Sequence, residues 1–229
     1  MSKYAPLIHK GITATPIYRC APPEDGSGRE TDSAASPEAA ALMRDLLMII
    51  DFDLNVQYYQ RQPVSVEYTD SSGDSRAFTP EFLITYRRDI VPARRMKPLL
   101  CDVMTRKDVL ENWAHLLPRI RAAHRHARGR GWRYQMLTER ELRTPYLDNA
   151  RFLLPYQRLK RNWEHARPLL NTLHELRQAD PESLLAACAE EDTLRAELLP
   201  MLWHLVAIRR IGADLSQLLT MRSTIWSKD

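Results

Sequence analysis

The sequence predicts an α/β domain built on a mixed sheet, followed by a second module that is mainly helical. Two observations predict this. Between residues 37 and 137 the apolar spacing changes from helical to alternating and back, and from residue 150 onward it is almost wholly helical. With 229 residues the chain has room for both, because single domains commonly have about 100 to 200 residues. We therefore expect a flexible leader over residues 1–35, an α/β domain over 36–149 and a helical C-terminal domain over 150–229.

The first helix is predicted to begin at Ser36. Ser36 is a good N-cap residue, and Pro37 suits the first helical position because its missing N–H is not needed there. The helix should end near Asp51. Its buried face is predicted from apolar residues at three- to four-residue spacing: Leu42, Leu46, Ile49 and Ile50.

The next segment has the pattern of β-strands. Apolar and polar residues alternate over 64–68, turn-forming residues follow at 71–74, and a second β-rich run covers 78–86, which together predict a hairpin. The short apolar run 99–104 is predicted to be a third strand in the centre of the sheet.

A basic helix is predicted over about 107–128, with a break or kink at Pro118 because proline cannot donate the helical hydrogen bond. The glycines near 130 end it, and residues 132–137 form a further strand. In the C-terminal domain we expect a small hairpin or wing within 211–226, a turn ordered by Asp214, and a core position for His204.

The positive charge of the chain is concentrated in its middle. Residues 87–133 hold 13 Lys and Arg against four acids, or +9, whereas the rest holds 20 basic and 25 acidic residues, or −5. Such a distribution is typical of a face that meets DNA, although a solvated basic helix shows it too. The arginines predicted to contact the DNA backbone are Arg106, Arg119, Arg121, Arg125, Arg128 and Arg130.

Several classes of function find no support in the sequence. No apolar run approaches the ~20 residues that a membrane span needs, and the start of the chain lacks the apolar core of a secretory signal, so we expect a cytoplasmic protein. The three cysteines are far apart, which argues against a zinc site or a disulfide framework. Motifs for nucleotide hydrolysis and acyl transfer are absent.

A series of short motifs resembles one family. The segments 51–53 (DFD), 79–84 (TPEFLI), 102–104 (DVM) and 131–134 (GWRY) are followed by Asn149 and by 202–205 (LWHL) and 211–215 (IGADL). In their order and spacing they resemble TnsA, the endonuclease subunit of two-protein cut-and-paste transposases. The resemblance implies a restriction-endonuclease-like core of the PD-(D/E)XK type, joined to a winged-helix-like C-terminal domain.

The resemblance also implies a catalytic site. Glu81 and Asp102 match the two metal-binding acids, and carboxylate oxygens are the ligands that Mg²⁺ prefers. Because strand side chains alternate, Asp102 should share a face with Met104, opposite Cys101 and Val103. The chain departs from the family where Met104 replaces a lysine and Met43 replaces a glutamate of the first helix.

Replacements for the two missing groups lie nearby in the sequence. Lys107 or Arg106 is a candidate for the cation, and Glu38 or Asp45 for the acid. Glu38 lies more than one helical turn from Met43, and Asp45 points to another face. Neither acid is taken as a catalytic residue. Lys107, the candidate cation just beyond the strand, is predicted to be catalytic together with Glu81 and Asp102.

Three functions remain open at this point. The first is a Mg²⁺-dependent endonuclease subunit that nicks one strand at transposon ends and, as the resemblance implies, works with a DDE-type transposase and an ATP-dependent regulator. The second is a catalytically silent subunit that binds DNA and positions these partners, which Met43 and Met104 favour. The third is a stand-alone restriction-like nuclease.

Overall fold

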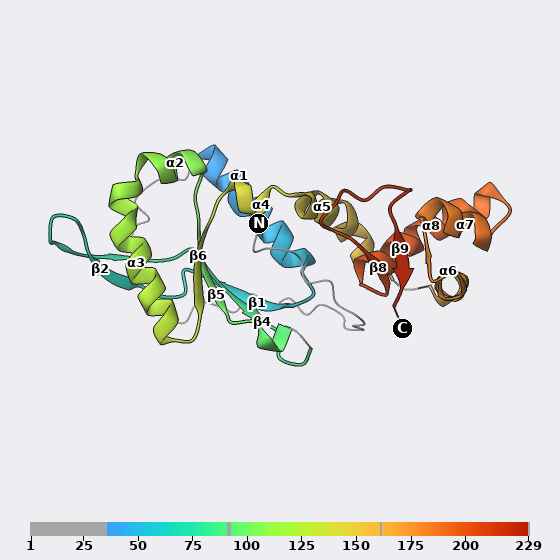
Figure 1. Cartoon of the computed structure of the whole chain (residues 1–229), viewed down its shortest axis with the longest axis horizontal. Coiled ribbons are helices and arrows are strands. Elements are labelled where there is room, and N and C mark those ends of the chain that lie inside the picture. The colour runs from blue at the N-terminus through green and yellow to red at the C-terminus, as the bar shows by residue number, and fades with distance from the viewer. Residues whose placement is uncertain (1–35, 91–92, 161, 229) are drawn as a thin grey trace. The chain divides into compact units, whose positions relative to one another are not determined.

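The computed structural model describes residues 36–90, 93–160 and 162–228. This part of the chain forms two compact units, an N-terminal and a C-terminal one, which meet in sequence between Leu142 and Arg143 (Figure 1). The predicted domain boundary at 149–150 falls inside a helix, α5 (Pro145–Gln157). The predicted leader, 1–35, lies outside the described residues.

The N-terminal unit is built on a four-stranded sheet in the order β1-β4-β5-β6. Its strands are β1 (Val56–Arg61), β4 (Phe82–Tyr86), β5 (Leu99–Val103) and β6 (Arg133–Leu137). β4 pairs antiparallel with both β1 and β5, whereas β5 and β6 are parallel. The mixed sheet is thus confirmed, with β5 at an inner position and buried along its whole length.

One prediction about the strands was wrong, and one strand was not predicted. The run 78–86 is not one strand, because β3 (Ser75–Phe78) ends before Pro80 and pairs only with β2 (Val66–Thr69) in a separate hairpin. Pro80 has no N–H to donate to a ladder, so the chain leaves the hairpin there. β1 was missed because Val56 is its only buried residue; the half-exposed Gln and Tyr side chains that follow hide the alternation of an edge strand.

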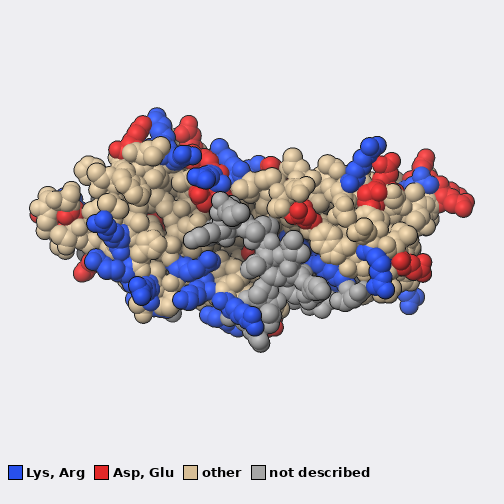
Figure 2. Space-filling model, viewed as in Figure 1, with Lys and Arg blue, Asp and Glu red and all other residues tan. Residues whose placement is uncertain are grey.

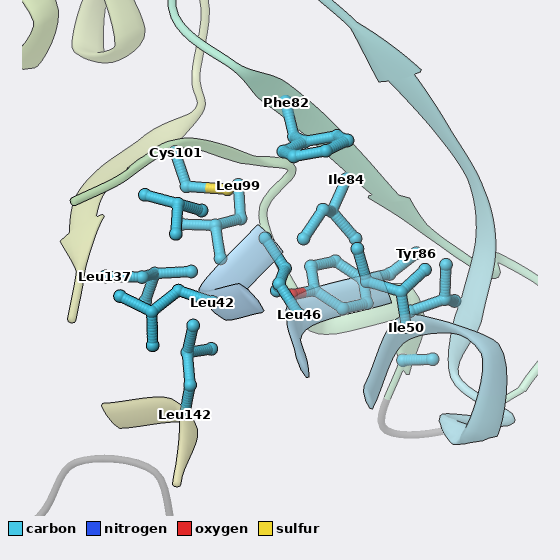
Figure 3. Packing of buried hydrophobic residues seen from close by; sticks show 13 residues of the cluster. Leu42, Leu46, Ile50, Phe82, Ile84, Tyr86, Leu99, Cys101, Leu137 and Leu142 are labelled. Carbon is cyan, nitrogen blue, oxygen red and sulfur yellow. The ribbon is translucent and has the colours of Figure 1, made fainter. Parts of the chain in front are cut away.

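Helix α1 (Pro37–Phe52) covers one face of the sheet (Figure 3). It starts as predicted, since the Ser36 hydroxyl accepts a hydrogen bond from the Ala39 N–H at 3.2 Å. Its buried side chains pack against β4, β5 and Leu142 of α4 (Glu139–Leu142). Ile49 is only partly buried, but the other predicted contacts are confirmed: Leu42, Leu46 and Ile50.

Helix α3 (Trp113–Gly129) packs on other residues of the same strands. Ala123 and Ala127 contact Leu83, Leu100 and Tyr134. Pro118 does not break the helix, which divides earlier, at Asn112, where α2 (Arg106–Glu111) ends. Pro118 is tolerated near the start of α3 because the helical hydrogen bond that it cannot donate would go to Ala114, which is exposed to water.

The described part of the C-terminal unit consists of four helices and a small sheet. The helices are α5, α6 (Trp163–Leu176), α7 (Pro181–Cys188) and α8 (Asp192–Ala207). The strands are β7 (Gln178–Ala179), β8 (Ile211–Ala213) and β9 (Ile225–Ser227), in the order β7-β9-β8. The antiparallel β8–β9 pair agrees with the hairpin expected over 211–226. A short 3₁₀ helix, η1 (Ala93–Arg95), precedes β5 in the other unit.

The buried Asn149 side chain holds the loop between β8 and β9. The amide of Asn149 donates to the carbonyls of Leu215 and Gln217 at 3.1 and 2.7 Å and accepts from the Leu219 N–H at 2.9 Å. Asp214 orders the turn as predicted, by accepting from the N–H of Ser216 at 2.9 Å. His204 is buried, also as predicted, and its Nδ1 lies 2.8 Å from the Tyr156 carbonyl oxygen.

None of the helices in the described part of the chain has the length and apolar character that crossing a membrane requires.

Candidate active site

Asp102 is the most buried charged residue of the described chain, with 1% of its surface exposed. Its Oδ1 accepts the Glu81 N–H at 3.2 Å and lies 3.2 Å from Nη2 of Arg119. Its Oδ2 accepts the hydroxyl proton of Tyr134 at 2.7 Å. Three donors, one of them charged, therefore compensate the carboxylate for the water that it has lost.

Arg119 reaches Asp102 because of its place on α3. It lies four residues before Ala123 and eight before Ala127, both of which pack on the sheet, so its side chain belongs to the same row of the helix. The guanidinium lies 4.3 Å from the centre of the Phe78 ring, and Nε is buried without a hydrogen-bond partner in the described chain. Sequence reasoning placed Arg119 on the DNA-binding surface and missed its ion pair with Asp102. It missed Tyr134 as well.

Glu81 directly precedes β4 and lies beside Asp102 of β5, whose Oδ1 accepts the Glu81 N–H. The β4–β5 ladder pairs Phe82 with Cys101 and Leu83 with Leu100, and continuing this register by one residue would set Glu81 opposite Asp102. Side chains in such a pair share one face of the sheet. Cys101 and Val103 pack with α1 on the opposite face, as predicted from alternation.

The pKa of Glu81 reports on this proximity. Burial raises the pKa of Glu81 above its ordinary value, the negative charge of Asp102 raises it further, and Arg61 and Arg119 act in the opposite direction. Two acids and two guanidinium groups thus influence one another at this end of the sheet. A divalent cation would relieve the repulsion between the carboxylates.

The methionines occupy the positions where the family supplies charged groups. Sδ of Met43 accepts a weak hydrogen bond from Nη2 of Arg61 at 3.8 Å, and Met104 follows β5, half-buried. Glu38 is exposed in the first turn of α1, and Asp45 is buried in the same helix. No group of three or more Asp, Glu, His or Cys side chains that would hold a metal ion occurs among the described residues.

Lys107 and Arg106 lie at the start of α2, and both side chains are exposed. The N–H of Arg106 donates to the Glu139 carboxylate at 2.8 Å. Within the described chain, no hydrogen bond or ion pair links Lys107 or Arg106 to Glu81 or Asp102. Arg119 is the cation that contacts Asp102.

Glu81 and Asp102 nevertheless fit a Mg²⁺ ion by their chemistry. Mg²⁺ in nucleic-acid enzymes is commonly held by one or two carboxylates, with water and phosphate oxygens as the other ligands. Glu81 and Asp102 supply two such carboxylates at the end of the β4–β5 ladder, where the charge of Asp102 acts on Glu81. A metal ion bound by Oδ1 of Asp102 would have to displace a group, because this oxygen already accepts the Glu81 N–H and forms an ion pair with Arg119.

Exposed arginines follow one side of α3. Arg121, Arg125 and Arg128 are exposed, and their spacing of four and three residues puts them on one helix face, turned away from the buried alanines. Arg130 follows the helix, and its guanidinium lies 5.2 Å from the Trp132 ring centre. Figure 2 shows basic side chains gathered over the end of the unit that carries α3. We call Arg121, Arg125, Arg128 and Arg130 the α3 basic face.

A mixed four-stranded sheet flanked by helices is consistent with a restriction-endonuclease-like fold. The family comparison agrees. The model described as TnsA-like endonuclease N terminal matches residues 53–139, and the model described as TnsA endonuclease C terminal matches residues 141–215. The chain therefore belongs to the TnsA-type endonucleases. No curated protein sequence matches it.

Removal of the Asp102 carboxylate is expected to destabilise the fold far more than removal of the Glu81 carboxylate. Asp102→Ala leaves Arg119 and the Tyr134 hydroxyl without their buried acceptor, which should lower the free energy of unfolding by about 3 to 5 kcal/mol. Glu81→Ala relieves a repulsion and should change it by less than about 1 kcal/mol. Urea denaturation followed by circular dichroism measures both. Equal losses in the two variants would contradict the role given to Asp102.

Proposed function

We propose that the chain is the DNA-cutting subunit of a Tn7-type transposase and nicks one strand at each transposon end by Mg²⁺-dependent hydrolysis. Membership in the TnsA family supports a nuclease subunit that works with DNA and a TnsB-type transposase. The observation that carries the proposal is the closeness of Glu81 and Asp102: the Asp102 carboxylate accepts the Glu81 N–H, and its charge acts on the Glu81 carboxylate.

Each group of the site has a distinct role in this proposal. Glu81 and Asp102 hold the Mg²⁺ ion, which when bound supplies an activated water and offsets the charge of the scissile phosphate. Tyr134 and the Glu81 N–H fix the orientation of the Asp102 carboxylate. The α3 basic face positions the DNA backbone without reading its sequence. The exposed positions of Lys107 and Arg106 favour a role in contacting DNA over a role at the metal.

The partners follow from the family. A DDE-type transposase would cut and join the other strand, and an ATP-dependent regulator would control when both act. The C-terminal unit, with its helices and the β8–β9 hairpin, is the proposed winged-helix-like module that docks these proteins.

A catalytically silent subunit is the second candidate. The observation in its favour is that Met43 and Met104 supply neither the acid nor the cation of the family, because a thioether carries no charge and donates no hydrogen bond. Such a subunit would bind DNA through the α3 basic face and position the transposase without cutting.

A cleavage assay separates the two candidates. With the cognate transposase, Mg²⁺ and a labelled transposon-end duplex, the natural chain should produce a nick on one strand. Glu81→Gln and Asp102→Asn keep the side-chain shapes but remove the negative charge, and each should reduce the initial nicking rate more than about 100-fold. Arg44→Gln, on the exposed side of α1, is the control and should cut normally. Equal nicking by all four proteins, or by none, would exclude the nuclease and leave the silent subunit.

DNA affinity should depend on the α3 basic face and on salt. Replacing Arg121, Arg125 and Arg128 together by Gln removes up to three phosphate contacts, which should lower the slope of log K against log salt concentration by about 2 to 3. Fluorescence anisotropy between about 50 and 200 mM salt measures the slope. The Arg140→Gln and Arg151→Gln double variant, in which both replaced arginines lie outside α3 and are also exposed, serves as the comparison. An unchanged slope in the triple variant would place the DNA on another surface.

A further inference from the structure

The Asp102 carboxylate has little room for a further ligand in the observed state. Each carboxylate oxygen has two lone pairs, and Oδ1 already accepts the Glu81 N–H and forms an ion pair with Nη2 of Arg119 at 3.2 Å. Oδ1 is also the oxygen nearer to Glu81, since it accepts the Glu81 N–H. A metal ion shared by the two acids would therefore use the position that the guanidinium now occupies.

Arg119 is held in a way that allows it to leave. Its ion pair with Asp102 joins Nη2 and Oδ1 at 3.2 Å, which is longer than the about 2.7 to 2.9 Å of strong charge-assisted hydrogen bonds. About a quarter of its side chain is exposed. The guanidinium carbon of Arg119 lies 4.3 Å from the centre of the Phe78 ring. The guanidinium can keep this contact while the side chain rotates away from Asp102.

Arg119 also has unused hydrogen-bonding capacity. Its Nε is buried and has no partner within the described chain, which is costly for a charged donor. A phosphate oxygen is a natural acceptor for such a donor, because the guanidinium fork matches phosphate geometry. Met104, at the position for which the resemblance implies a lysine, cannot supply a cation.

We propose that Arg119 and a divalent cation bind Asp102 alternately: Arg119 holds the carboxylate until the metal arrives and then turns to the DNA phosphate. The inference rests on the proposed function only in taking Glu81 and Asp102 as the metal ligands. It makes Arg119 the phosphate-binding cation of the site and gives the buried carboxylate a counter-ion in both states.

The proposal predicts that removal of Arg119 tightens metal binding in the absence of DNA. Mn²⁺ binding to the full chain is measured by isothermal titration calorimetry for the natural protein and for Arg119→Gln, which removes the guanidinium charge. Arg119→Gln should lower the dissociation constant about tenfold, because the ion no longer displaces a charged hydrogen-bond donor.

Two further variants control the measurement. Arg61→Gln removes a positive charge that acts on Glu81 and whose guanidinium contacts Met43, so it reports the general electrostatic effect and should change the Mn²⁺ dissociation constant less than about threefold. Asp102→Asn should abolish the binding. If Arg119→Gln proves unfolded by circular dichroism, Arg119→Lys, a weaker competitor with a charge in place, should still tighten binding more than Arg61→Gln does.

The outcomes distinguish the inference from the function on which it rests. Equal or weaker Mn²⁺ binding by the Arg119 variants, or tightening matched by Arg61→Gln, overturns the inference even if the natural protein cuts DNA. An absence of Mn²⁺ binding in every variant overturns it as well. Tighter binding by Arg119→Gln together with an inactive natural protein supports the inference and rejects the nuclease.

Discussion

The structure of the N-terminal unit depends on one constraint, the burial of the Asp102 carboxylate at the end of the inner strand β5. A buried charge without compensation costs more free energy than a small domain can spare. The fold therefore brings three donors to it from three elements: the Arg119 guanidinium from α3, the Tyr134 hydroxyl from β6 and the Glu81 N–H from the start of β4. The order β4-β5-β6 and the docking of α3 are what allow all three to meet.

The same arrangement connects stability with chemistry. Asp102 is a structural residue because its removal would leave Arg119 without its partner, and it is the proposed metal ligand because Glu81 lies beside it. Proteins often retain an unfavourable charge cluster where function requires it. The raised pKa of Glu81, caused first by burial and then by Asp102, is the mark of such a cluster. Met43 and Met104 carry no charge. The positive charges that act on Glu81 are those of Arg61 and Arg119, and Arg119 also forms the ion pair with Asp102.

Much of the fold was predictable because it depends on local patterns. The cap at Ser36 and the apolar spacing of α1 identified the first helix, and the apolar run 99–103 identified the inner strand. β1 was not predictable in the same way, since a half-exposed edge strand has no clear alternation. The pairing of Glu81 with Asp102 depends on a register between strands, and Arg119 on the docking of α3; neither is a property of a sequence window. A signal for Arg119 did exist, because a buried aspartate requires a cation and the basic helix follows directly.

The position of the metal tests the proposed site most directly. Crystals of the chain with transposon-end DNA and Mn²⁺, measured at an X-ray wavelength where manganese scatters anomalously, should show a single strong peak at the end of the β4–β5 ladder. We expect this peak to lie about 2.0 to 2.3 Å from carboxylate oxygens of both Glu81 and Asp102, within the range for hard cations, with the Arg119 guanidinium on a DNA phosphate. Bound DNA with no manganese between the acids, and Arg119 still paired with Asp102, would contradict both the metal site and the exchange at Asp102.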